Sequence, residues 1–165
     1  MNAKILVVED EPAINELIAG TLDLSDFDVV QAYDTQGAYV AVVDEKPDLV
    51  LLDWMMPHGE SGIDFARRLK KNPATADIPI IMLTAKGEED NKVYGLDAGV
   101  DDYITKPFST RELISRVKAV LRRTGIDMGK ELMQAGNLSI NTASQRIMAG
   151  GTEITMSITE YRLLC

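Results

Sequence analysis

Five polar residues in this chain have types and positions that could support chemistry. Each lies at or just beyond the end of a short apolar run. They are Glu9, Asp10, Asp53, Thr84 and Lys106. A carboxylate at the end of a buried strand is costly unless a cation or hydrogen bonds stabilise it. The repeated pattern therefore predicts one acidic pocket built from several strand ends.

Three clustered carboxylates repel one another, so this pocket needs a cation. Oxygen ligands favour a hard ion, and Mg²⁺ is commonly held by a few carboxylates together with phosphate oxygens. Asp53 is the natural nucleophile for an aspartyl-phosphate, while Lys106 and the Thr84 hydroxyl could hold the remaining phosphoryl oxygens. Each acid alone is better explained as a solvated strand-end residue. The combination favours a metal-assisted phosphoryl site.

The elements that would position these residues alternate along the chain. Apolar runs typical of strands buried on both faces occur at Ile5–Val8, Leu49–Leu52 and Ile80–Leu83, with a weaker run around Tyr103-Ile104 and a fifth candidate at Asp28–Ala32. Helical patterns separate them. The alternation predicts an α/β fold with a five-stranded, parallel, doubly wound sheet, whose carboxyl edge carries the ligand site.

The five predicted helices are marked by apolar residues at helical spacing. The first follows Pro12 and has Ile14, Leu17, Ile18 and Leu22 on its apolar stripe, and a shorter helix covers Gly37–Asp44. The later ones are marked by Ile63, Ala66 and Leu69, by Val93, Leu96 and Val100, and by Leu113, Val117, Val120 and Leu121. Ser109 and Glu112 have capping-box spacing at the start of the last.

The chain changes character after this alternating unit. Residues 1–123 would complete one domain, and residues 124–133 are interpreted as a linker because they lack periodicity and contain two glycines. Residues 134–165 contain short strand-like runs, a Gly150-Gly151 turn signal and the start of a helix. A segment with this small number of elements can bury only a small core, and residues 134–165 are therefore expected to be an incomplete domain.

Composition excludes several classes of protein. The formal net charge of −9 argues against non-specific binding to nucleic acid or anionic membranes. The single cysteine, Cys165, allows no intramolecular disulfide, and no apolar run is long enough for a signal peptide or a membrane span. These features predict a soluble protein of a reducing, cytoplasmic setting.

The motifs that contain the five polar residues resemble the receiver domain of two-component response regulators. The matching segments are ILVVEDE, LVLLDWMMP, Ser61-Gly62, IIMLTAK and DDYITKPF. They span residues 1–123, and the details are most similar to the OmpR/PhoB type, in particular its phosphate-regulon members. The tail resembles the opening of that type's winged-helix DNA-binding domain, without the recognition helix. The resemblance implies a flavodoxin-like receiver joined to a truncated DNA-binding domain.

The resemblance also assigns roles by position. Asp53 would be the phosphoacceptor, and Lys106 would contact the phosphoryl group. Mg²⁺ would be bound by Asp10 and Asp53, by Glu9 through water, and by the backbone carbonyl of Met55. Thr84 and Tyr103 would form the switch pair, although Tyr103 alone could equally be a half-buried strand aromatic. The Lys106–Pro107 peptide bond would be cis.

A charged surface on the last part of the domain would mediate dimerisation in this family. Its residues are Lys92, Asp97, Asp101, Glu112, Arg116 and Arg123. Without the resemblance, a solvated charged face would be the better explanation. With it, mixed charges suit a two-fold interface in which acids meet bases of the second subunit.

The main functional hypothesis is a switch phosphorylated by a sensor histidine kinase that controls transcription, for example of phosphate-starvation genes. Promoter DNA and RNA polymerase would be partners only of a full-length form. A stand-alone receiver or decoy dimeriser is the alternative. An aspartate-nucleophile phosphatase is excluded because Met55 replaces the general acid two residues after the nucleophile, so only self-phosphorylation and slow self-dephosphorylation are expected.

Overall fold

The structure, a computed structural model, describes residues 2–57, 59–85 and 98–126, together with the backbone of four short strands between residues 132 and 154. The chain divides into two compact units, residues 2–126 and residues 127–165, which are treated separately below. In the described part of the chain, no helix combines the length and the hydropathy that crossing a membrane requires.

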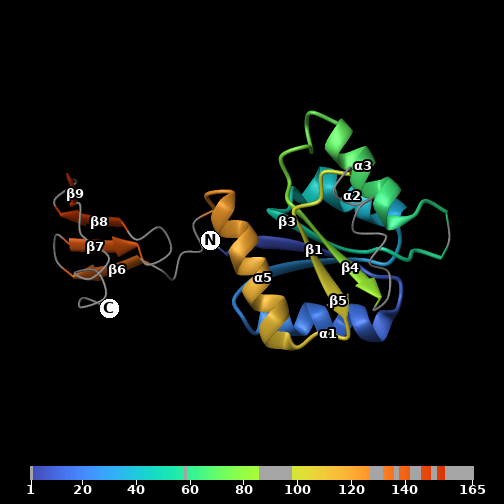
Figure 1. Cartoon of the computed structure of the whole chain (residues 1–165), viewed down its shortest axis with the longest axis horizontal. Helices are drawn as coiled ribbons and strands as arrows, with labels where there is room; N and C mark the ends of the chain where they lie inside the picture. The colour runs from blue at the N-terminus through green and yellow to red at the C-terminus, as the bar shows by residue number, and fades with distance from the viewer. Residues whose placement is uncertain are drawn as a thin grey trace. The chain divides into compact units, whose positions relative to one another are not determined.

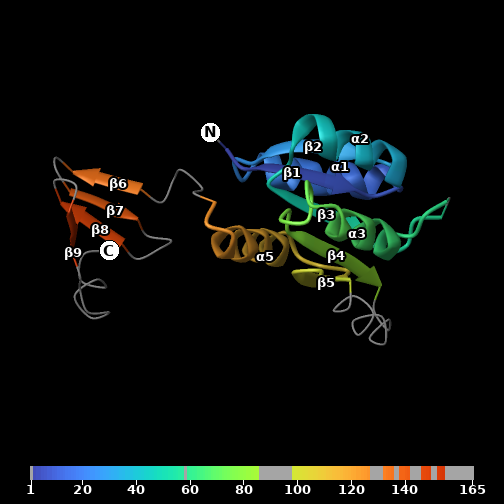
Figure 2. The same cartoon turned by 90° about the horizontal axis from the view of Figure 1, so that it is seen from above.

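The first unit is built around a parallel five-stranded sheet. Its strands are β1 (Lys4–Val8), β2 (Asp28–Ala32), β3 (Leu49–Asp53), β4 (Ile80–Ala85) and β5 (Asp102–Lys106). The order is β2-β1-β3-β4-β5, and it can be followed in Figure 2. All adjacent pairs are parallel, so the carboxyl ends of all five strands meet at one edge. This confirms the predicted doubly wound, flavodoxin-like fold.

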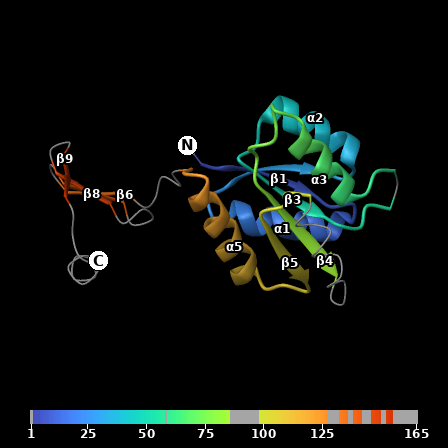
Figure 3. The same cartoon turned by 45° about the horizontal axis from the view of Figure 1, so that its top comes forward.

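Helices cover both faces of this sheet. They are α1 (Pro12–Asp23), α2 (Thr35–Glu45), α3 (Gly62–Lys71) and α5 (Thr110–Arg123). Figures 1 and 3 show α1 and α5 on one face and α2 and α3 on the other. The helix predicted from Val93 and Leu96 falls in residues 86–97, outside the described residues.

Side-chain caps begin three of these helices. The Asp34, Ser61 and Ser109 side chains accept hydrogen bonds from the backbone N–H groups three residues further on. The bond from Glu112 N to Ser109 Oγ is 3.0 Å long, at the position where the sequence predicts a capping box. Such caps satisfy backbone donors that have no partner inside the helix.

The core is close to the predicted one, with an error in α1. Ile18 and Leu22 are buried, but Leu17 is 63% exposed, and the inward position is occupied instead by Asn15. Successive helical residues are about 100° apart, so the predicted stripe spans more of the circumference than the sheet covers. The side that faces the sheet is defined by residues 15, 18 and 22.

The second unit contains an antiparallel sheet among its described residues. The strands are β6 (Leu132–Ala135), β7 (Leu138–Asn141), β8 (Arg146–Ala149) and β9 (Thr152–Ile154), in the order β6-β7-β8-β9. β6 begins inside the stretch interpreted as a linker, residues 124–133. Four residues are too short to show periodicity, and β6 is defined by its pairing with β7. The predicted helix start at residues 159–164 lies outside the described residues.

Candidate functional site

Lys106, at the end of β5, joins the two carboxylates on neighbouring central strands. Its Nζ lies 2.6 Å from Glu9 Oε2 and 3.2 Å from Asp53 Oδ2. Glu9 immediately follows β1, and Asp53 is the last residue of β3, so the parallel arrangement brings residues 97 positions apart in the sequence into contact. The predicted convergence of Glu9, Asp53 and Lys106 is therefore present in the geometry.

Burial makes the charges of Glu9, Asp53 and Lys106 costly to maintain. The side chain of Glu9 is 2% exposed and that of Asp53 is 9% exposed, while Lys106 is 24% exposed. Loss of solvent, aided by the charge of Asp53, raises the pKa of Glu9 to about 7 despite the opposing effect of Lys106. Burial disfavours the charged form of Lys106, but its bonds and attraction to Glu9 and Asp53 outweigh this and raise its pKa. One lysine thus compensates two buried acids.

A third acid completes a group that could hold a metal ion. One carboxylate oxygen from each of Glu9, Asp10 and Asp53 lies within 4.8 Å of the other two. Three oxygen donors from two adjacent strand ends suit a hard divalent cation with several remaining water ligands. The residues present therefore fit Mg²⁺. The three carboxylates outnumber the single positive charge of Lys106, and this excess negative charge attracts the cation.

Backbone contacts fix the two buried acids. The N–H of Met55 donates to Asp53 Oδ1 at 3.2 Å, and the N–H of Glu11 donates to Glu9 Oε1 at 3.3 Å. The backbone of Asp53 also packs directly against Gly62 at the start of α3. A Cβ at Gly62 would lie 3.0 Å from the Asp53 carbonyl carbon and 3.1 Å from the Trp54 carbonyl oxygen. Only glycine allows this approach.

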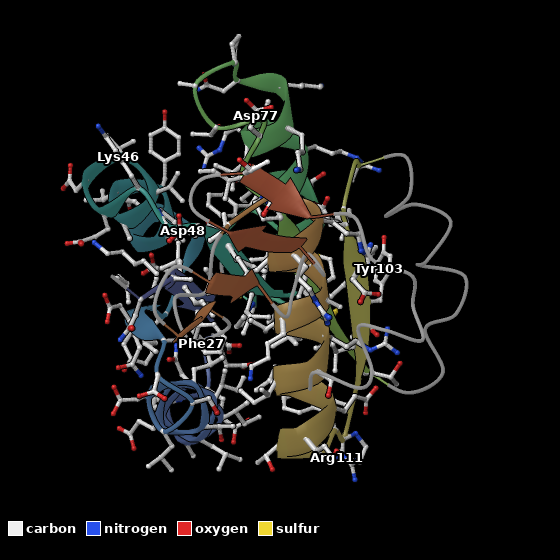
Figure 4. The ribbon with its side chains drawn as sticks, turned by 90° about the vertical axis from the view of Figure 1, so that its left-hand side faces the viewer. Phe27, Lys46, Asp48, Asp77, Tyr103 and Arg111 are labelled. Carbon is white, nitrogen blue, oxygen red and sulfur yellow. The ribbon has the colours of Figure 1, made fainter. Side chains whose placement is uncertain are left out.

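Thr84 lies on β4, the strand next to that of Asp53, and Tyr103 lies on β5, one strand further on. Thr84 is 2% exposed and follows Leu83, the residue paired with Asp53 across β3 and β4. Tyr103 lies on β5, where Figure 4 labels it, opposite Met82. Its ring packs against the core, and its buried hydroxyl has no hydrogen-bond partner among the residues that the structure describes. The Lys106–Pro107 peptide bond, for which the resemblance implies the cis form, is cis.

The residues predicted for a dimer surface do not all lie on the same surface of the structure. Arg116 pairs with Glu112 at 3.5 Å, and Arg123 is exposed on the same helix. Asp101 instead accepts hydrogen bonds from Lys70 Nζ and from the N–H of Ile80, because it lies between α3 and the start of β4. Lys92 and Asp97 lie outside the described residues.

Asp102 is the acid that the sequence reasoning missed on this surface. Both of its carboxylate oxygens bond Arg116 Nη1, at 3.1 and 3.2 Å. Asp101 and Asp102 are adjacent, and successive residues of an extended segment point to opposite sides. The alternation of side chains along the strand could have predicted that Asp102 lies on this surface, but only if the first residue of β5 had been known.

Comparison with known proteins identifies the class of protein to which this chain belongs. Residues 5–118 match the family described as the response regulator receiver domain. The chain therefore belongs to this family, which confirms the resemblance drawn from its motifs. It is a receiver of a response regulator, not a catalytic enzyme in the usual sense.

The curated relatives narrow the class to regulators of the PhoB/OmpR type. The chain is 55% identical to the phosphate regulon transcriptional regulatory protein PhoB of Pseudomonas aeruginosa, over 97% of this chain and 69% of that protein. It is 47% identical to PhoB of Escherichia coli K12, over 99% of this chain and 71% of that protein. It is also 43% identical to the transcriptional regulatory protein ResD of Bacillus subtilis, over 98% and 68%.

Solved structures support the same fold. The receiver domain of the Francisella response regulator 1452 superposes with a TM-score of 0.68 at 36% identity, covering 74% of this chain and 99% of that chain. A putative response regulator from Chloroflexus aurantiacus gives a TM-score of 0.70 at 32% identity, covering 73% and 98%. Each of the two matched chains is covered almost in full.

Proposed function

We propose that Asp53 accepts a phosphoryl group from a sensor histidine kinase, in a reaction that requires Mg²⁺. The observation that carries this proposal is the environment of the Asp53 carboxylate. It is nearly buried, contacts Lys106 at 3.2 Å and lies beside two further acids on the same sheet edge. Phosphoryl transfer to an aspartate needs a nucleophilic carboxylate, a site that binds a divalent cation and a positively charged side chain.

In the transfer step, an Asp53 carboxylate oxygen forms a bond to phosphorus. The bond between phosphorus and the kinase's histidine nitrogen breaks, and its electron pair stays with the imidazole. Lys106 moves from Glu9 and Asp53 towards the new phosphoryl oxygens and balances their charge. Bound Mg²⁺, held by Asp10, Asp53 and the Met55 carbonyl with Glu9 acting through water, would neutralise charge on the phosphoryl group. Slow hydrolysis of the same bond resets Asp53.

The response to phosphorylation would pass through Thr84 and Tyr103. Thr84 approaches the phosphoryl group because its hydroxyl is a donor near a new acceptor, and a phosphate that contacts only one arrangement of Thr84 shifts the population towards it. The ring of Tyr103 then fills the space that Thr84 leaves. The buried hydroxyl of Tyr103 has no hydrogen-bond partner among the described residues, and this supports the proposal, because such a polar group gains from moving to a solvated or bonded arrangement.

The output would be phosphorylation-promoted dimerisation and control of transcription. The surface of Glu112, Arg116 and Arg123, with Lys92, Asp97 and Asp101 of the original prediction, would face its copy across a two-fold axis. Asp102 now adds an acid beside Arg116. Residues 1–123 would be the receiver, 124–133 a linker and 134–165 the first part of a winged-helix domain.

The relatives support the proposed partners and setting of this output. Several of them are named phosphate regulon transcriptional regulatory proteins, so phosphate-starvation promoters are the proposed targets. Promoter DNA and RNA polymerase would be contacted by a form with the whole DNA-binding domain. A cytoplasmic setting suits a partner of the intracellular part of a sensor kinase.

The decisive experiment measures phosphorylation directly. The chain is incubated with Mg²⁺ and acetyl phosphate, and intact mass is followed for the wild type, Asp53→Asn and Asp64→Asn. Asp64 is the matched control, because it is an exposed acid on α3 outside the cluster. We expect one added phosphoryl group on the wild type and on Asp64→Asn, and none on Asp53→Asn. Equal labelling of Asp53→Asn would refute Asp53 as the acceptor.

The same samples test dimerisation by light scattering. We expect a higher average mass after phosphorylation of the wild type and no increase for Arg116→Glu. Arg111→Glu is the comparison, because Arg111 is exposed on the same helix but forms none of the observed ion pairs. An unchanged dimer in Arg116→Glu would exclude this surface as the interface.

A further inference from the structure

The most informative polar residue outside the acid cluster is Asn15 in α1. It is 0% exposed, so its amide must find all its partners within the protein. Its Nδ2 donates to the carbonyl oxygens of Glu9 and Ala32, both at 2.9 Å, and its Oδ1 accepts from Gln31 Nε2 at 2.8 Å. Both donors and the acceptor of the amide are thus used.

These bonds fasten α1 to the ends of two strands. The N–H of Glu9 already donates to the carbonyl of Ala32 at 3.2 Å, which is the last bond between β1 and the end of β2. Beyond this bond, the Asn15 side chain donates to the next backbone acceptor, the carbonyl oxygen of Glu9. The Asn15 amide therefore fixes the backbone carbonyl of Glu9 just after β1 ends.

The Glu9 carbonyl is a sensitive point because two acids depend on it. The peptide group between Glu9 and Asp10 is planar, so fixing its oxygen also fixes the direction of the Asp10 N–H and limits where the Asp10 side chain starts. The same bond restricts the backbone of Glu9. Asn15 consequently constrains two of the three carboxylates that form the metal-capable group.

Gln31 adds direction to this arrangement. A rotated Asn15 amide would point its oxygen at two backbone carbonyl oxygens, and the bond from Gln31 Nε2 favours the productive orientation. Gln31 lies on β2 and is itself exposed, so it can be replaced with little effect on the core.

We infer that Asn15 is a positioning residue for the divalent cation site, and that Gln31 acts through it by orienting its amide. This inference rests on the proposed function, because it concerns the Mg²⁺ bound by Glu9, Asp10 and Asp53. Groups that orient metal ligands commonly change metal affinity by tenfold to about a hundredfold when they are removed. Asn15→Leu, which keeps a similar shape but cannot donate, is expected to weaken Mg²⁺ binding by about tenfold or more.

The test measures Mg²⁺ dissociation constants by calorimetry and by fluorescence of Trp54, the single tryptophan of the chain, which follows Asp53. The proteins compared are the wild type, Asn15→Leu, Gln31→Leu, the double variant and Thr75→Val. Thr75 is the matched control, because it is a buried residue whose hydroxyl bonds the Leu69 carbonyl at 2.7 Å, away from the acid cluster. Thermal unfolding establishes a temperature at which all are folded.

The expected pattern separates positioning from loss of stability. Thr75→Val should unfold at a lower temperature yet bind Mg²⁺ as the wild type does, whereas Asn15→Leu should bind it about tenfold more weakly or worse. Gln31→Leu should weaken binding by a smaller factor, and this effect should disappear in the background of Asn15→Leu. Equal effects of Thr75→Val and Asn15→Leu would overturn the inference, because they would show a general consequence of destabilisation.

Two further outcomes are decisive. Unchanged Mg²⁺ affinity in folded Asn15→Leu would overturn the role of Asn15 while leaving the metal site intact. If Asn15→Leu does not fold, Gln31→Leu decides, and wild-type affinity in that variant would overturn the inference. A wild type that binds no Mg²⁺ would instead refute the metal site of the proposed function, and the positioning role with it.

Discussion

Gly62→Ala should disturb both the stability of the receiver and its phosphorylation. The added Cβ would overlap the Asp53 carbonyl oxygen and lie only 3.0 Å from the carbonyl carbon and 3.1 Å from the Trp54 carbonyl oxygen. A carbon atom normally stays about 3.3 Å or more from such an oxygen, so α3 and the end of β3 must separate by roughly 1 Å. Both sides of the clash are backbone, so rotation of a side chain cannot relieve it.

The cost should be at the upper end of the range for overpacked sites, about 3 kcal/mol, which corresponds to a melting temperature lower by roughly 10 °C for a domain of this size. Displacing Asp53 by that distance should also slow phosphorylation by tenfold to about a hundredfold. Urea unfolding and the rate of mass gain with acetyl phosphate measure the two effects separately.

Gly20→Ala provides the control with the opposite sign. Gly20 is exposed in the interior of α1, and a Cβ there would have no atom within 4 Å. Alanine is the better helix former, so this variant should be more stable by about 1 kcal/mol and be phosphorylated normally. A Gly62→Ala protein as stable as the wild type, or a destabilised Gly20→Ala, would refute the steric reasoning.

Three further predictions concern ionisation, capping and the charged surface. Burial raises the pKa of Glu9 from its ordinary 4.5 to about 7, so the metal-free folded protein binds more protons than the unfolded chain between these values. Its free energy of unfolding should fall as pH rises through this window, by at most about 3 kcal/mol, and urea titrations of Glu9→Gln should lack this decline. Ser109→Ala removes the acceptor for the Glu112 N–H at 3.0 Å, so it should lower the free energy of unfolding by about 1 kcal/mol in the same assay. Asp102→Ala breaks the partly exposed pair with Arg116 and should change stability by less than about 1 kcal/mol, while light scattering of the phosphorylated protein shows a weaker dimer.

The strands and the converging acids could be predicted because both are expressed locally in the sequence. Runs such as Ile5–Val8 and Leu49–Leu52 are apolar on both faces, and only strands of a covered parallel sheet bury such runs. Once the sheet is parallel, strand ends share an edge, so the meeting of Glu9, Asp53 and Lys106 follows from topology. The edge strand Asp28–Ala32, which is only partly apolar, was also predicted with its observed bounds.

The remaining features depend on contacts that have no local signature. Asn15 is polar, and its burial is worthwhile only because two strand-end carbonyls and Gln31 satisfy it. Leu17 is apolar and belongs to the helical stripe, but the sheet does not reach it. Asp101 was predicted for the charged surface and Asp102 was not, but which of these two side chains lies beside Arg116 depends on where β5 begins.

The contact between Lys106 and Glu9 has a consequence during protein synthesis. The first acid leaves the ribosome long before the lysine that joins it, because 97 positions separate them. Chains are made at about 5–20 residues per second, so for several seconds β1 and β3 exist without β5. During that interval the nascent chain has Asp53, the proposed acceptor, but not Lys106, whose positive charge the proposed reaction uses. A kinase encountering it would meet an unfinished acceptor, and signalling would begin only after β5 has joined the sheet.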